Sequence, residues 1–148
     1  MARNLTAKNP SGSGDEETGA KQCSVLVIDD SEIARAKMVE LLSAKGMKVA
    51  TRASPIGATR AILSSDITVV VIDVLMPGMR GDRLAALFRG NPRLASLGVV
   101  LVSGESDAEL NRLRDEVGAD AVVSKSNLQD LAAAVLYARR QRLAMSER

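Results

Sequence analysis

Four short apolar runs in this chain each end at polar residues that are able to take part in chemistry. The runs and the residues that end them are 25–28 before Asp29 and Asp30, 69–72 before Asp73, 99–102 before Ser103, and 121–123 before Ser124 and Lys125. Continuous runs rich in Val and Ile are typical of strands that are covered on both faces, as in a parallel sheet. Open parallel sheets bind ligands beyond the carboxyl ends of their strands. We therefore expect three carboxylates, a hydroxyl and an ammonium group to meet at one edge of the sheet.

Helical patterns separate these runs and complete an alternating order of strands and helices. The expected helices span 31–45, 55–65, 82–90, 107–117 and 127–145. Their apolar faces are formed by Ala34, Met38, Leu41, Leu42, Leu84, Leu87, Phe88, Leu110, Leu113, Val117, Leu128, Leu131 and Val135. The run 47–52 alternates and carries charges, which favours an edge strand. The alternation predicts an α/β fold, a doubly wound five-stranded parallel sheet with right-handed crossovers.

Capping signals mark the starts of the last two helices. Residues 106–109 (Ser-Asp-Ala-Glu) and 126–129 (Ser-Asn-Leu-Gln) both fit the capping box, in which a hydroxyl and a carboxylate or amide satisfy backbone N–H groups reciprocally. We therefore expect Ser126 to anchor the last helix. Glycines follow two helices, Gly46 after the first and Gly118 after the fourth, as expected at helix ends.

Composition supports one folded domain behind a polar leader. The chain has 148 residues, of which 46% are hydrophobic, and this is enough for one core. Residues 1–22 are polar and rich in Gly and Ser, so we expect a disordered leader, with the folded domain over 23–146. The leader lacks the apolar centre of a signal peptide, and the chain has no apolar stretch of about 18 residues that would suit a membrane span.

Charge and residue usage exclude several functions. A net charge of +2 is too small to suggest a nucleic-acid partner. The chain contains no histidine, which removes histidine-based triads, histidine metal sites and phosphohistidine chemistry on this chain. Cys23 is the only cysteine, so no internal disulfide forms and a cytoplasmic location is expected.

Three aspartates at one edge of a sheet repel one another. At an effective dielectric constant of about 20, two unit charges about 4 Å apart cost about 4 kcal/mol. A hard divalent cation would compensate, and Mg²⁺ binds one or two carboxylates together with waters and phosphate. The alternative is structural: Asp30 caps the first helix beside Ser31, and Asp73 simply opens a loop. The presence of Ser103 and Lys125 at two further strand ends favours the metal site.

A carboxylate beside Mg²⁺ and a lysine suits attack on a phosphoryl group to give an aspartyl-phosphate. Asp73 stands alone after its strand and precedes a glycine-containing loop, so it is the expected nucleophile. Asp29 and Asp30 would then hold the metal. Lys125 supplies a positive charge, and Ser103 supplies a hydrogen-bond donor for the phosphoryl oxygens.

These residues resemble the receiver domain of bacterial two-component response regulators over about residues 23–146. The matching elements are Asp29-Asp30, residues 73–81 with the pattern Asp-x-x-Met-Pro-x-x-x-Gly, Ser103-Gly104 and Lys125. The resemblance implies a flavodoxin-like three-layer sandwich with strand order 2-1-3-4-5. It also implies a stand-alone, chemotaxis-type regulator, not an enzyme beyond its own phosphorylation and dephosphorylation.

The same resemblance implies roles for particular residues and partners. Asp73 accepts phosphate from a sensor histidine kinase or a histidine phosphotransfer protein. Asp30, Asp73 and the backbone carbonyl of Leu75 ligate Mg²⁺, and Asp29 contributes directly or through water. Ser103 moves to bond the phosphoryl group, and Lys125 pairs with it. A downstream protein is expected to dock on the fourth helix, fifth strand and fifth helix, with no nucleic-acid or membrane partner.

Two positions depart from the family pattern. Val122 stands where the family usually has an aromatic residue, so we expect activation through loop and helix shifts around 103–107 without an aromatic swing. Ser126 replaces the proline that often follows the lysine. Because a cis bond before a non-proline residue costs about 2.5–4 kcal/mol, we predict a trans Lys125–Ser126 peptide.

Two other interpretations stay open. A receiver-fold adaptor or scaffold that works without phosphate would tolerate Val122 and Ser126. The other interpretation is that the chain is a fragment of a hybrid kinase. The starting Met1 and the polar leader argue against it. Because residues up to about 146 are used by the fold, we expect no output domain and signalling by docking.

Overall fold

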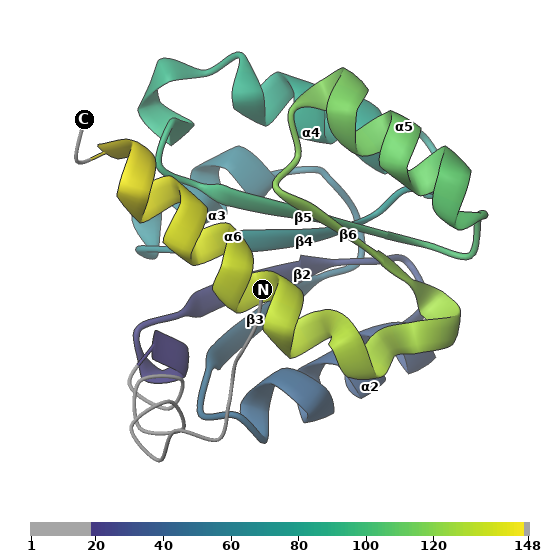
Figure 1. The fold of residues 1–148 in the computed structure, drawn as a ribbon, viewed down its shortest axis with the longest axis horizontal. Coiled ribbons are helices and arrows are strands. Elements are labelled where there is room, and N and C mark those ends of the chain that lie inside the picture. Colours follow the sequence, from purple (N-terminus) through teal and green to yellow (C-terminus); the bar gives the residue numbers. More distant parts are fainter. Residues whose placement is uncertain (1–18, 147–148) are drawn as a thin grey trace.

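The computed structural model describes residues 19–146 and contains a five-stranded parallel sheet with helices on both faces (Figure 1). Its strands are β2 (Ser24–Ile28), β3 (Lys48–Arg52), β4 (Val69–Asp73), β5 (Gly98–Ser103) and β6 (Ala121–Ser124). Its helices are α2 (Glu32–Ser43), α3 (Ala58–Ser64), α4 (Gly81–Arg89), α5 (Asp107–Val117) and α6 (Leu131–Ser146), with short 3₁₀ segments η1 (Pro92–Leu94) and η2 (Lys125–Asp130). The strand order β3-β2-β4-β5-β6 confirms the predicted doubly wound 2-1-3-4-5 topology.

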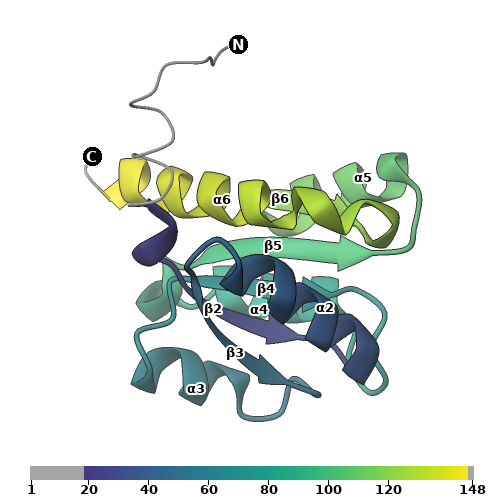
Figure 2. The ribbon, with the colours of Figure 1, turned by 90° about the horizontal axis from the view of Figure 1, so that it is seen from below.

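Alternating side chains of the central strands form two separate cores. On β2, Val25 and Val27 pack with Met38 of α2 and with α6, whereas Leu26 and Ile28 pack with α3, α4 and α5 on the other face. Figure 2, turned by 90° from Figure 1, shows the helices that cover the sheet from another side. Because both faces of the central strands are covered, these strands consist of continuous apolar runs with no polar alternation.

The edge strand and most helix positions agree with the predictions. Residues 48–52 pair only with β2 and carry exposed polar side chains, as expected of an edge. Ser106 caps α5 by accepting a hydrogen bond from the Glu109 N–H, and Gly118 ends that helix with a φ of 75°. Leu87 is 57% exposed, so its predicted place on the buried face of α4 was wrong.

The start of the last helix differs from the prediction. Ser124, not Ser126, provides the cap, accepting a hydrogen bond from the Ser126 N–H. A 3₁₀ segment follows and α6 begins at Leu131. Asn127 has a non-helical backbone within that segment, so the capping box at 126–129 does not form. The described residues contain no cis peptide, which confirms the trans Lys125–Ser126 bond.

The described structure includes residues before position 23. Residues 19–21 form a helical turn, and Ala20 is 2% exposed and belongs to the core beside α6. The prediction of disorder is therefore wrong for residues 19–22, because a small alanine side chain is buried by neighbours that local sequence does not reveal. Residues 1–18 of that leader lie outside the described part of the chain. Over the described residues, no helix has the length and apolar character needed to cross a membrane.

Candidate functional site

Four strand ends bring the expected polar residues to the same edge of the sheet. In the register of the central strands, Ile28 lies opposite Ile72, so Asp29 and Asp73 follow at neighbouring positions. Ser103, the last residue of β5, lies opposite Ser124 of β6, and Lys125 comes next. Asp29, Asp73 and Ser103 are buried polar residues, with exposures of 0%, 3% and 1%. The parallel sheet therefore juxtaposes residues that are up to 96 positions apart in the sequence.

Three carboxylates and one ammonium group form the centre of the site. One ligand oxygen each of Asp29, Asp30 and Asp73 lies within 4.8 Å of the others. The Lys125 Nζ lies 3.0 Å from Asp29 Oδ2 and 3.4 Å from Asp73 Oδ2. With three negative charges and one positive, the cluster carries a formal charge of −2 when all four groups are ionised. Such a cluster favours an additional cation.

Local hydrogen bonds orient the buried Asp29 carboxylate. Its Oδ1 accepts a bond of 2.8 Å from the Ser31 N–H, and Ser31 in turn caps α2 through the Ala34 N–H. The serine therefore fills the capping role, and the alternative in which Asp30 caps this helix is wrong. Asp30 is exposed and remains available at the edge.

The remaining oxygen of Asp29 fits a metal ligand. Oδ2 is enclosed and has no hydrogen-bond partner among residues 19–146, although the Lys125 ammonium lies 3.0 Å away as an ion-pair partner. An unsatisfied buried carboxylate oxygen is costly. A hard cation that prefers oxygen ligands would satisfy it, and the three-carboxylate donor set suits Mg²⁺.

Burial and charge perturb the pKa values of the two central groups. Burial first, and then repulsion from Asp29, raise the pKa of Asp73 from 3.8 to about 6, although Lys125 acts in the opposite direction. Burial tends to lower the pKa of Lys125, but its contacts with Asp29 and Asp73 outweigh burial and raise that pKa. Lys125 therefore stays charged, and Asp73 is the group whose protonation changes most readily.

Ser103 and Leu75 lie beside this centre. The Ser103 Oγ accepts a bond of 3.2 Å from the Glu105 N–H. The Leu75 N–H donates to Asp73 Oδ1 at 3.3 Å, and the leucine side chain is half exposed. The structure thus brings all the predicted site residues to one edge, while metal ligation by the Leu75 carbonyl stays a prediction.

Sequence reasoning missed three residues that shape this edge. The Arg35 Nη1 donates a bond of 2.7 Å to the Asp29 carbonyl, and Arg80 connects the start of α4 to Glu105. Arginines on helix surfaces are too common for spacing alone to distinguish these two. Their roles depend on which loops the fold places beside them.

A family model for the response regulator receiver domain matches residues 25–136. The chain belongs to the response regulator receiver domain family. The receiver fold is a signalling domain and not an enzyme of the usual kind, and receiver domains bind Mg²⁺ at an acidic pocket such as the one formed by Asp29, Asp30 and Asp73.

Similar proteins include regulators and solved receiver domains. The receiver is 32% identical to a gliding motility regulatory protein of Myxococcus xanthus over 74% of this chain and 14% of that protein. It is 28% identical to protein PilG of Pseudomonas aeruginosa over 68% of this chain and 75% of that protein. A crystal structure of a receiver domain protein from Clostridium thermocellum has a TM-score of 0.72 and 25% identity, covering 83% of this chain and 98% of that one. The chain spans less than half the length of several curated relatives that it matches.

The raised pKa of Asp73 predicts a pH dependence of Mg²⁺ binding by this receiver. A metal ligand must be deprotonated, so a carboxylate with a pKa of about 6 should lower the apparent Mg²⁺ affinity about tenfold between about pH 7 and pH 5. Titration calorimetry at the two pH values measures this difference. An Asp73→Asn variant should bind Mg²⁺ weakly at both, without this pH dependence, and an equal dependence in that variant would contradict the assignment.

The same pKa predicts how stability changes with pH in the absence of Mg²⁺. Because the folded-state pKa of Asp73 lies above its ordinary value, the folded protein holds this proton more tightly than the unfolded chain. The contribution of Asp73 to stability is therefore fully present below about pH 4 and is lost as the pH rises through about 6. Mg²⁺ held by Asp29, Asp30 and Asp73 would offset this loss by neutralising the carboxylates.

Proposed function

We propose that this receiver is a single-domain response regulator that takes a phosphoryl group on Asp73 from a histidine kinase or a histidine phosphotransfer protein. The observation that carries the proposal is the buried Asp73 carboxylate at a strand end, 3.4 Å from the Lys125 ammonium and beside two further aspartates. Receiver domains interact with such phosphodonors and with downstream targets. Because we propose transfer from these donors, we also propose a cytoplasmic location.

The proposed chemistry is direct transfer to the carboxylate. An Asp73 oxygen attacks the phosphorus atom, and an acyl phosphate forms as the P–N bond to the donor imidazole breaks. The released imidazole takes a proton from solvent. Lys125, held near both carboxylates, pairs with a phosphoryl oxygen, and Ser103 donates its hydroxyl proton to another after its side chain turns. Hydrolysis returns Asp73 to its unphosphorylated form: water attacks the phosphorus atom, the bond to the carboxylate oxygen breaks, and inorganic phosphate is released.

Asp29, Asp30, Asp73 and the backbone carbonyl of Leu75 are the proposed ligands of Mg²⁺. When bound, the cation neutralises phosphoryl oxygens and permits an anionic donor to approach the carboxylates. Without a cation, the formal charge of −2 on this cluster would repel that donor. We therefore expect phosphorylation to require Mg²⁺.

Phosphate incorporation tests the proposal. The wild-type chain, incubated with Mg²⁺ and acetyl phosphate, should gain the mass of one phosphate in intact-protein mass spectrometry, and Asp73→Asn should gain none. Asp66→Asn is a matched control, because Asp66 is exposed and its left-handed backbone (φ 54°) suits Asn. An unmodified wild type, or equal labelling of Asp73→Asn, would refute the assignment.

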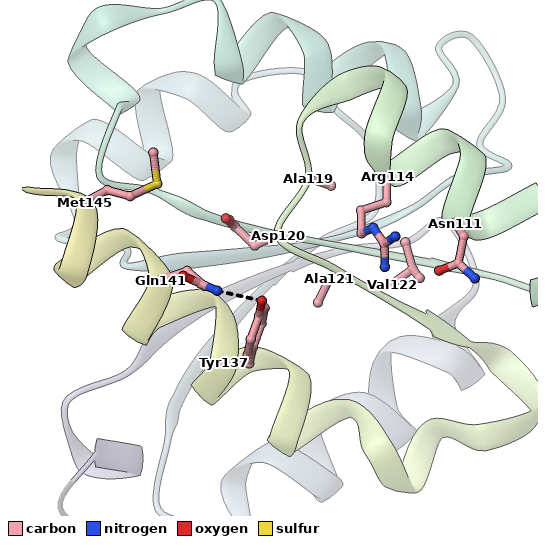
Figure 3. A pocket seen from close by; sticks show the side chains of 9 residues that line it. All are labelled: Asn111, Arg114, Ala119, Asp120, Ala121, Val122, Tyr137, Gln141 and Met145. Carbon is pink, nitrogen blue, oxygen red and sulfur yellow. Dashed lines mark hydrogen bonds between the residues drawn. The ribbon is translucent and has the colours of Figure 1, made fainter. Parts of the chain in front are cut away.

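We also propose that phosphorylation regulates docking on the face formed by α5, β6 and α6. A hollow of about 480 Å³ lies between these elements, and Figure 3 displays the side chains around it. Its lining residues are Asn111, Arg114, Ala119, Asp120, Ala121, Val122, Tyr137, Gln141 and Met145. Tyr137, the only tyrosine, is held by a bond of 2.6 Å from Gln141. A partially exposed aromatic ring beside a hollow is a common anchor for a protein partner.

A phosphate-independent adaptor is the second candidate, and Val122 favours it. With no aromatic ring to relocate at this position, the hollow changes less between states than it would around a mobile ring. The two candidates differ in one measurable quantity. An adaptor would bind its partner equally well before and after treatment with acetyl phosphate, whereas a phosphorylation-dependent regulator would not.

A further inference from the structure

The residue before α4 has unusual chemistry for its position. Helix N-caps are usually Ser, Thr, Asp or Asn, whose side chains accept a bond from the first turn. Arg80 is the N-cap of α4, with an extended backbone (φ −66°, ψ 141°), and its side chain makes no capping bond. The guanidinium instead places Nε 3.0 Å from Asp82 Oδ1 and Nη2 3.8 Å from Glu105 Oε1. The side chain therefore connects the start of α4 with the loop after β5.

Glu105 is also the residue that holds the Ser103 hydroxyl. Its backbone N–H donates to Ser103 Oγ at 3.2 Å, while its carboxylate faces Arg80. Two groups of one residue thus join the phosphate-binding hydroxyl to an arginine on a neighbouring loop. The pKa of Glu109, in the first turn of α5, is lowered chiefly by its hydrogen bond with Arg112, and Arg80 adds a smaller electrostatic effect in the same direction.

The next residue brings Arg80 close to the phosphorylation site. Gly81 packs so tightly over the Asp73 carbonyl that an added Cβ would lie 2.0 Å from that oxygen. The Gly81 N–H also bonds to the Val74 carbonyl at 2.7 Å. The backbone that carries Arg80 is therefore fixed against the end of β4, and only its side chain is free to change partners.

We propose that Arg80 is a positioning residue that restrains the Glu105 loop, and through it Ser103, in the unphosphorylated arrangement. This inference rests on the proposed function of Asp73. Phosphorylation replaces the single negative charge of the Asp73 carboxylate with a phosphoryl group of about −1.5 to −2 charges, and this group competes with Glu105 for the guanidinium. Loss of the restraint frees Ser103 to turn toward the phosphoryl oxygens.

The strength of the Arg80–Glu105 contact suits a reversible restraint. Arg80 is about half exposed and Glu105 about a quarter exposed, and exposed ion pairs of this kind are weak. Removing such a pair should change the equilibrium constant between the restrained and the free arrangement of the Glu105 loop by about two- to fivefold. A change of this size shifts the populations of the two arrangements without locking the domain in either.

The initial rate of phosphorylation by acetyl phosphate tests this proposal. Arg80→Ala should be labelled about two- to fivefold faster than wild type, because more molecules have Ser103 free. Removing a positive charge near the site would by itself slow the reaction with an anionic donor, so steering does not explain a faster rate. Arg83→Ala, an exposed arginine of the same helix with no ion pair in the described structure, is the matched control and should not be faster.

Three further variants separate positioning from a merely structural effect. Arg80→Lys should restore the wild-type rate, and Glu105→Gln should reproduce the increase. In the double variant, the two effects should not add, because both remove the same interaction. The Glu105 amide resonance should move in Arg80→Ala toward its position in wild type treated with beryllofluoride and Mg²⁺.

The outcomes distinguish this inference from the function on which it rests. If wild type is not labelled and beryllofluoride leaves the Glu105 amide unchanged, the proposed function fails. If wild type responds but Arg80→Ala has an unchanged or slower rate, Arg80 does not restrain the loop. Additive effects in the double variant would likewise overturn the inference.

Discussion

Replacing Asp120 with alanine is expected to lower the free energy of unfolding by about 3–5 kcal/mol. Asp120 immediately precedes β6 and its side chain is 4% exposed. One oxygen lies 2.6 Å from Arg89 Nη2 and accepts the Val99 N–H at 2.8 Å, and the other lies 2.7 Å from Arg142 Nη2. The carboxylate thus joins the end of α4, the start of β5 and the last turns of α6.

The large effect comes from the cations that would be left behind. Arg89 and Arg142 are 14% and 13% exposed, and they repel each other once the shared carboxylate is removed. Burial and the neighbouring Arg142 already lower the pKa of Arg89, against the effect of Asp120. Breaking a buried pair costs far more than breaking an exposed one, because the remaining charge cannot be hydrated.

Urea unfolding measures this prediction, with Asp115→Ala as the control. Asp115 also pairs with an arginine, Arg114, at 3.0 Å, but it is highly exposed, so its loss should cost about 0–1 kcal/mol. Asp120 lies at the end of β6 remote from Lys125, so the folded variant should still be labelled by acetyl phosphate at low temperature. Equal unfolding energies for the two variants would show that the buried cluster contributes no more than a surface pair.

The second large effect is expected for Gly81→Ala, which should slow phosphorylation of Asp73 about a hundredfold. The new Cβ would lie 2.0 Å from the Asp73 carbonyl oxygen and 2.7 Å from Ile72 Cγ2. Because the first of these is backbone, neither side-chain rotation nor repacking relieves the overlap. The end of β4 and the start of α4 must separate, which displaces Asp73 from Lys125 and also destabilises the fold by about 1–3 kcal/mol.

Gly90→Ala is the matched control for this variant. Gly90 lies at the other end of α4 with an ordinary helical backbone, and an added Cβ would meet nothing closer than 3.5 Å. It should leave the labelling rate unchanged and stabilise the protein slightly. Labelling at a range of acetyl phosphate concentrations, with circular dichroism to confirm folding, tests both variants. A wild-type rate for folded Gly81→Ala would show that the site tolerates this displacement.

The strands and the site residues could be predicted from the sequence for a simple physical reason. A central parallel strand is apolar on both faces, so each run ends where the chain leaves the sheet, and Asp29, Asp73 and Ser103 mark those ends. Parallel strands place their carboxyl ends at the same edge. The same logic failed for α6, since Ser124 and Ser126 offer similar capping chemistry and the choice between them depends on where β6 ends.

Contacts between helices and loops could not be predicted from the sequence pattern. Nothing in the local pattern distinguishes Arg89 and Arg142, which share Asp120, from the many surface arginines of the chain. Leu87 fits the apolar spacing of its helix but is exposed, because α4 packs through Leu84, Ala85 and Phe88. Such outcomes depend on which elements lie side by side, and residue spacing within one element carries no information about its neighbours.

The amino-acid sequence alone was enough to predict the order of strands and helices, the edge of the sheet at which the polar site residues lie, and the residue types present there. These follow from hydrophobic periodicity and from the geometry common to all parallel sheets. How those groups act on one another became known from the packed fold: the raised pKa of Asp73, the position of Lys125 between two carboxylates and the contacts that connect Arg80 through Glu105 to Ser103. Electrostatic interactions depend on distances and burial across the fold, and these quantities exist only once the chain is packed.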